Sequence, residues 1–229
     1  MKNTILVVAA HPDDEVLGCG GTMALHSING DTVHVLILAQ GITSRDNSDS
    51  EARLVQLRMA ADKANKALRV ASLTLMTFPD NRMDSVDRLD ITKAIEEHIH
   101  RLKPKTVYTH HAGDLNVDHR RTHEAVMTAC RPLPGNTVTT VLSFEVASST
   151  EWQSPIPTLA FVPNWFVDIS KTLELKKKAL FAYQSEMRAW PHARSIKAVE
   201  HLAHWRGAII GVDAAEAFVL NRNIITAYV

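Results

Sequence analysis

Ile5-Leu6-Val7-Val8-Ala9-Ala10-His11-Pro12-Asp13-Asp14-Glu15 is an apolar run that ends in one histidine and three acids. A continuous aliphatic run of this kind predicts a strand that is buried on both faces. Burying four ionisable groups at the end of such a strand costs free energy unless a partner compensates their charge. A divalent metal ion is the simplest such partner. We therefore expect a strand-to-helix turn that carries a metal site.

Length and composition favour an ordinary soluble protein with one domain, spanning residues 1–229. Lys plus Arg and Asp plus Glu each number 25, a balance that predicts neither nucleic acid nor a membrane surface as a partner. Cys19 and Cys130 are far apart and indicate buried thiols of a reducing compartment. No signal-peptide pattern and no bilayer-length apolar run is seen, so we expect a cytoplasmic protein.

The first half of the chain alternates apolar strand patterns with amphipathic helix patterns. This order is typical of an α/β fold with an open, parallel sheet and helical crossovers. Gly18, Gly20 and Gly21 weaken the first helix but permit close approach of a ligand or a neighbouring strand. The expected strands are residues 4–10, 33–38, 72–78 and 106–109, and the expected helices are 13–28, 51–68, 89–102 and 118–130.

The second half is less regular. Residues 138–146 predict a further strand, and residues 148–163, which contain several prolines, predict a loop. A short strand over residues 165–169 is expected next. Two helices, over residues 173–183 and 196–206, are expected after it.

Polar side chains follow the strands of the predicted sheet: His11, Gln40, Asp80 and His110 each stand just beyond a strand. The carboxyl ends of parallel strands share one edge of the sheet, where ligands bind in folds of this class. These four side chains are therefore expected to converge.

A catalytic zinc site needs three protein ligands and an open position for water. His11 and Asp14 are three residues apart across the expected turn and can reach one point. His119, at the start of a helix after another strand, is the best third ligand. The metal would lower the pKa of water, and Asp13 is the natural base to take the proton. Each of these residues alone would more simply be a helix-start charge or a solvated histidine, and their joint occurrence favours the metal.

His11-Pro12-Asp13-Asp14-Glu15 followed by Asp118-His119 resembles the PIG-L/LmbE-like family of zinc-dependent de-N-acetylases. The resemblance runs through most of the chain. It implies a Rossmann-like three-layer sandwich with a mostly parallel sheet, and hydrolysis of an N-acetyl group on an amino sugar. It also implies zinc, or another divalent metal, bound by His11, Asp14 and His119, with Asp13 as general base. Further similar segments are Gly18-Cys19-Gly20-Gly21, Phe78-Pro79-Asp80, Tyr183-Gln184-Ser185-Glu186, His192-Ala193-Arg194-Ser195 and Ala215-Glu216-Ala217-Phe218.

The chain departs from the family at Asn116, where many members carry a histidine that polarises the amide or protonates the leaving amine. Asparagine donates a hydrogen bond but passes no proton. We expect His192 to take the acid's role, with His110 and His111 as other candidates and a surface position for His192 as the simpler alternative. Asp118 is expected to orient a histidine. If His192 acts from a neighbouring subunit, the protein is a homo-oligomer.

Six polar residues are expected to hold the hydroxyls or a phosphate of a small amino-sugar substrate, although each alone fits a solvated loop. They are Arg45, Asp80, Asn81, Arg82, His110 and Asp114. Two alternatives stay open: an amidase for a thiol-pathway conjugate or another non-sugar amide, and a non-catalytic sugar-binding module. A nucleotide-binding protein is disfavoured because residues 18–21 lack the GxGxxG spacing.

Overall fold

The computed structural model describes residues 2–41 and 50–225. Their strands form one seven-stranded sheet in the order β3-β2-β1-β4-β5-β7-β6. Strands β1 to β5 are parallel, and β7 is antiparallel to both of its neighbours. The strands are β1 (Thr4–Ala9), β2 (Thr32–Ala39), β3 (Ser72–Phe78), β4 (Thr106–His110), β5 (Thr140–Phe144), β6 (Trp165–Asp168) and β7 (Ala215–Asn223).

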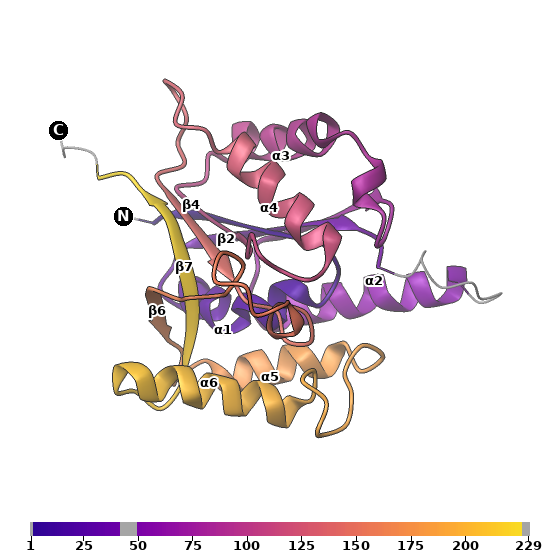
Figure 1. The fold of residues 1–229 in the computed structure, drawn as a ribbon, viewed down its shortest axis with the longest axis vertical. Coiled ribbons are helices and arrows are strands. Elements are labelled where there is room, and N and C mark those ends of the chain that lie inside the picture. Colours follow the sequence, from indigo (N-terminus) through magenta and orange to yellow (C-terminus); the bar gives the residue numbers. More distant parts are fainter. Residues whose placement is uncertain (1, 42–49, 226–229) are drawn as a thin grey trace.

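Helices cover both faces of the sheet, with α3 and α4 on one side and α1, α2, α5 and α6 on the other (Figure 1). None of the helices in the described ranges has the length and apolar composition of a membrane span. The helices are α1 (Asp14–Ile28), α2 (Ser50–Ala67), α3 (Arg88–Leu102), α4 (Val117–Ala129), α5 (Leu173–Ala182) and α6 (Ile196–Ile210), with short 3-10 helices η1 (Met83–Ser85) and η2 (Thr150–Trp152).

Strand β1 explains why the chain begins with an unbroken apolar run. Ile5 and Val7 belong to the core beneath α1, α2 and α5, whereas Leu6 and Val8 belong to the core beneath α3 and α4. Successive side chains of a strand point to opposite faces, so a central strand of a three-layer fold must be apolar at every position. The predicted α/β class and the mostly parallel sheet are confirmed.

The sequence interpretation missed β7. This strand inserts between β5 and β6 and pairs with both, Thr140 opposite Asn223 and Asp168 opposite Ala215. Its second half contains Asn221, Arg222 and Asn223, which break the apolar pattern that identifies a buried strand. Strand β5 is also shorter than the predicted 138–146.

The glycines at the start of α1 let the helix lie directly on the sheet. A Cβ atom added at Gly21 would lie 2.8 Å from Ile169 Cδ1, and one added at Gly18 would overlap the Phe144 ring. Cys19, between them, has non-helical backbone angles. The expectation of close approach by a neighbouring strand is confirmed, since Phe144 ends β5 and Ile169 follows β6.

Candidate metal centre and active site

The charged motif lies where β1 turns into α1. Asp13 stands immediately before the helix with φ +109°, a conformation that L-residues rarely adopt. The carbonyl oxygen of Asp13 accepts the N–H groups of Val16 and Leu17, so the helix starts directly from this turn. The turn therefore places His11, Asp13 and Asp14 at the carboxyl edge of the sheet.

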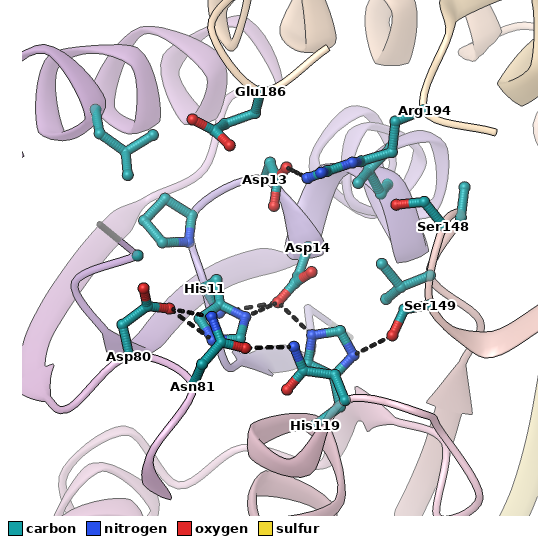
Figure 2. A pocket seen from close by; sticks show the side chains of 17 residues that line it. His11, Asp13, Asp14, Asp80, Asn81, His119, Ser148, Ser149, Glu186 and Arg194 are labelled. Carbon is teal, nitrogen blue, oxygen red and sulfur yellow. Dashed lines mark hydrogen bonds and ion pairs between the residues drawn. The ribbon is translucent and has the colours of Figure 1, made fainter. Parts of the chain in front are cut away.

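Three predicted metal ligands converge there (Figure 2). Asp14 Oδ2 lies 3.2 Å from His11 Nδ1 and 3.1 Å from His119 Nε2. One ligand atom from each of these residues lies within 4.8 Å of the other two. Two imidazoles and a carboxylate are the donor types of a catalytic zinc site. This geometry fits the predicted set of His11, Asp14 and His119.

Each of the two histidines has a carboxylate on its second ring nitrogen. His11 Nε2 lies 2.9 Å from Asp118 Oδ2, and His119 Nδ1 lies 3.1 Å from Asp114 Oδ1. Such partners fix the tautomer and the orientation of a metal-binding imidazole. His11 is thereby set to offer Nδ1, and His119 is set to offer Nε2. The orienting role of Asp118 stays a prediction, and this contact with His11 is the one that the role requires.

Backbone and hydroxyl groups hold both carboxylates in place. Asp118 accepts the N–H groups of Asn81, at 2.6 Å, and Met83, at 2.9 Å. Asp114 is fully buried and accepts the hydroxyls of Ser149 and Thr150. The two histidines are therefore supported from segments on either side of the cavity.

The neighbouring groups of the cluster shift the pKa values of Asp14, His119 and His11 toward their charged forms. Burial opposes ionisation of Asp14, but His119 and His11 outweigh it and hold the Asp14 pKa well below its usual range. Burial likewise opposes the charge on His119, yet Asp14 and Asp114 raise its pKa to about 9. The His11 pKa is raised in the same way, against burial, by Asp118 and Asp14.

A cavity of about 170 Å³ opens beside the cluster. His11, Asp13, Asp14 and His119 line one part of it, and Glu186 and Arg194 line another. Arg194 Nη1 lies 3.3 Å from Asp13 Oδ2. Burial and the neighbouring Asp14 raise the pKa of Asp13 well above its usual range. Asp13, the three candidate metal ligands and a cavity of about 170 Å³ thus share one site.

Glu15, the last acid of the motif, points away from this cavity into the core. Its carboxylate accepts the Tyr183 hydroxyl at 2.7 Å, the Asn65 side-chain amide at 2.9 Å and the Asp13 N–H at 3.0 Å. Burial raises the pKa of Glu15. Because Glu15 holds the Asp13 backbone, it supports the turn.

The predicted substrate-binding residues divide into groups. Asp80 and Asn81 line the cavity, and Asp80 Oδ1 lies 3.3 Å from His11 Nε2. Arg82 is exposed and absent from the described cavity lining. Arg45 falls within residues 42–49, outside the described residues.

His110 and Asp114 lie beneath His119 and not in the cavity, so their positions do not provide the expected contacts with a sugar. His110 is fully buried, stacks on the His119 ring at 3.9 Å, and accepts the Ala10 N–H at 2.8 Å. Burial and His119 lower the pKa of His110 well below its usual range. Both residues contact the His119 imidazole and support it from the core side.

The candidates for a catalytic acid lie apart from the cavity lining. His192 Nδ1 accepts the Arg194 N–H at 3.0 Å, and its ring packs edge-on against Trp152. His111 Nε2 lies 3.0 Å from the Leu159 carbonyl oxygen. Asn116 does line the cavity, where its side chain caps α4. Among the described residues of one chain, no histidine replaces Asn116 at the cavity.

Arg194, Glu186 and Ser149 reach the site, yet none was predicted to do so. The segments that contain Arg194 and Glu186 resemble the family, but the sequence favoured His192 as the residue that enters the site. Which side chain of a short turn faces a cavity depends on the turn's rotation. Residue types alone do not reveal that rotation.

Comparisons with known proteins identify the family of this chain. The family model PIG-L, described as GlcNAc-PI de-N-acetylase, matches residues 6–130. A 1D-myo-inositol 2-acetamido-2-deoxy-alpha-D-glucopyranoside deacetylase of Rhodococcus jostii is 28% identical over 93% of this chain and 95% of its own length.

Two solved structures share the fold over almost the whole chain. The N,N'-diacetylchitobiose deacetylase of Pyrococcus horikoshii aligns with TM-score 0.77 and 20% identity, covering 96% of this chain and 84% of its own. GalB, the 4-carboxy-2-hydroxymuconate hydratase of Pseudomonas putida, aligns with TM-score 0.79 and 22% identity over 100% of both chains. At these identities the two structures establish the fold alone. The family match spans more than half of the 229 residues, from β1 to the end of α4, and the chain therefore belongs to the PIG-L family of de-N-acetylases.

Proposed function

We propose that this protein is a zinc-dependent hydrolase that removes the N-acetyl group from an N-acetylated amino sugar, giving the free amine and acetate. The observation that carries this proposal is the convergence of His11, Asp14 and His119 at a cavity that also contains Asp13. Family membership supports the reaction type.

The donor set fits zinc. His11 Nδ1, Asp14 Oδ2 and His119 Nε2 would hold the ion, leaving the side toward the cavity open. Two imidazoles and one carboxylate also suit other divalent metals of the first transition row. Zinc differs from most of them because it has no redox chemistry. When bound, the cation would lower the pKa of water, polarise the amide carbonyl and offset the Asp14 charge that helps to raise the Asp13 pKa.

Asp13 is placed to act as general base. Its carboxylate lines the same cavity as the three ligands but belongs to a different side of the turn from Asp14. In the proposed reaction Asp13 takes the proton of the attacking water and then returns it to the departing amine. This second step gives the reaction an acid without a histidine at position 116.

Substrate hydroxyls are assigned to the wall formed by Asp80 and Asn81. Asn81 accepts the Asn116 side-chain amide at 3.0 Å, so these two asparagines form a fixed polar edge. Asp80 and Asn81 were predicted to bind sugar hydroxyls, and they remain the candidates that line the cavity. Arg45 stays a prediction.

The substrate is proposed to be an N-acetylglucosamine derivative, which gives its acetyl group to water. The relative in R. jostii is named for an inositol-linked 2-acetamido sugar, and the structural neighbour in P. horikoshii for diacetylchitobiose. The hydratase neighbour shows that the fold also carries other chemistry, so the proposal depends on the residues of this site.

Acetate release tests the proposal. Purified protein is loaded with zinc and incubated with N-acetylglucosamine, N,N'-diacetylchitobiose and an inositol-linked N-acetylglucosamine, and acetate is measured enzymatically. We expect release that a chelator abolishes and zinc restores, with loss of at least ~10²-fold in Asp13→Asn. The exposed Asp84→Asn is the matched control. Turnover of non-sugar amides alone would favour the amidase alternative, and bound zinc without turnover would favour a binding module.

A further inference from the structure

The turn of residues 190–195 brings one cation to the catalytic motif from the other end of the chain. We propose that Arg194 is a positioning residue of the deacetylase, holding the Asp13 carboxylate in its working orientation, and that His192 serves by shaping the turn that presents Arg194. This inference rests on the proposed function, in which Asp13 is the general base.

The contact is specific in its geometry. Arg194 Nη1 donates to Asp13 Oδ2 at 3.3 Å across 181 positions of sequence. In the described part of the chain, no hydrogen bond engages Oδ1 of the same carboxylate. One oxygen is therefore held while the other stays available to accept a proton. Figure 2 shows the guanidinium reaching the Asp13 side chain along the cavity wall.

Asp13 needs such a partner because its own turn fixes only its backbone. The Asp13 N–H is bound to Glu15, and its positive φ is set by the start of α1. Neither contact restrains the side-chain torsion. Arg194 supplies the side-chain hydrogen bond that does so.

The turn that carries Arg194 is itself tightly held. The Arg194 N–H donates to His192 Nδ1 at 3.0 Å, and the Arg194 carbonyl oxygen accepts the Arg188 N–H at 3.2 Å. The next residue, Ser195, caps α6 by accepting the Ala198 N–H at 3.1 Å. These bonds leave the Arg194 side chain as the part of the turn that projects into the cavity.

His192 Nδ1 accepts a hydrogen bond from the backbone N–H of Arg194, two residues further along the chain. Asparagine makes the same local contact with its side-chain oxygen, as in an Asx turn. The structure therefore separates two roles for His192. A proton donor needs imidazole, whereas a turn former needs only an acceptor at this position.

The first experiment compares Arg194→Met and Arg194→Lys with Arg188→Met. Arg188 lies in the same segment and is exposed, and in the described structure its guanidinium donates only to the carbonyl groups of Ser185 and Met187. Loss of a fixed reactive group costs on the order of 10²-fold in rate. We expect that loss in kcat for Arg194→Met, with little change in KM, zinc content or Tm. Lysine should restore part of the rate, and Arg188→Met should behave as the unmodified protein. Unchanged kcat in Arg194→Met, or an equal loss in Arg188→Met, overturns the inference.

The second experiment compares His192→Asn with His192→Ala. We expect His192→Asn to keep most of kcat and His192→Ala to lose rate as Arg194→Met does. Equal, severe loss in both variants would show that imidazole itself is required and would overturn the assignment of His192.

A third measurement keeps this inference distinct from the proposed function. If the unmodified protein releases no acetate from any substrate, the proposed function fails, and crystal structures of zinc-loaded unmodified protein and Arg194→Met still test the contact. We expect one Asp13 orientation in the former and a rotated or multiple carboxylate in the latter. An identical Asp13 side chain in both would overturn the inference whatever the activity.

Discussion

His119 Nδ1 lies 3.1 Å from Asp114 Oδ1, on the opposite side of the imidazole from the predicted metal position. Asp114 was expected to hold a sugar hydroxyl, but it is fully buried behind the His119 ring. There it also accepts the hydroxyls of Ser149 and Thr150, which lie next to the cavity wall. Asp114 therefore links the loop before α4 to the loop after β5 through the metal site.

Asp114→Asn should weaken zinc binding without abolishing it. The amide preserves the shape of the side chain but loses the charge that orients His119 and raises its basicity. Loss of such an outer partner typically costs 10- to 100-fold in metal affinity, so we expect a fall of about that size. Competition with a chromophoric chelator measures the affinity, and Asp84→Asn, an exposed acid on η1, is the control. Equal affinities in the two variants would contradict the role given to Asp114.

Zinc binding should release protons near neutral pH. In the metal-free protein, Asp14 and Asp114 raise the His119 pKa to about 9 against the effect of burial, and the His11 pKa is also raised. Zinc must displace these protons, so its affinity should rise with pH until His119 is neutral, above about 9. Calorimetry at pH 7 in buffers of different ionisation enthalpy counts the protons. Zinc binding with no proton release would contradict these shifts.

The raised His119 pKa should also make the stability of the metal-free fold fall as pH rises, whereas zinc affinity rises with pH. A histidine whose folded pKa exceeds its unfolded value stabilises the fold below the unfolded value and loses that contribution as pH rises through the folded one. For His119 this window runs from about 6.5 to about 9. Metal-free protein should therefore lose stability across this range in urea unfolding, whereas excess zinc should reverse the trend.

The close contact of α1 with the sheet predicts a steric effect at Gly21. Gly21→Ala would place a methyl group against Ile169, and overpacking of this kind costs about 1–3 kcal/mol. Ile169→Ala in the same chain should recover part of that loss, because it removes the nearest side-chain atom. Urea unfolding of the two single variants and the double variant measures the coupling. Strict additivity would show that α1 can shift away from the sheet at little cost.

The convergence of the three candidate metal ligands could be predicted from the sequence because their positions follow from two regular features. His11 and Asp14 stand at the end of a strand that its apolar run identifies, and His119 opens a helix after another parallel strand. Parallel strands bring their carboxyl ends to one edge, so these residues had to lie close together.

The supporting residues could not be predicted in this way. Asp80 and Asp114 both lie in loops just beyond a strand, yet one faces the cavity and the other the core. The direction of a loop side chain depends on contacts with distant segments, here Ser149 and Thr150 for Asp114. Strand β7 was missed because its polar half gives no strand signal although it pairs with β5.

The Asn116 side chain caps helix α4, and this role accounts for an amide at position 116. Its side-chain oxygen accepts the Asp118 N–H at 2.8 Å as the cap of α4, the helix that carries His119. Asn116→Ala should therefore lower the free energy of unfolding by about 1 kcal/mol, and Asn116→Ser, which also caps helices, should lose less. Urea unfolding of zinc-loaded protein measures both.

Activity of the same variants decides whether Asn116 also acts in the reaction. If Asp13 carries the proton to the amine, Asn116→Ser should keep a kcat close to that of the unmodified protein, because the cap and therefore His119 stay in place. Asn116→Ala should lose activity only as far as it loses zinc, and excess zinc should restore it. A fall in kcat of ~10²-fold in fully zinc-loaded Asn116→Ser would instead show that the amide contacts the reacting carbonyl and supplies a hydrogen bond to it.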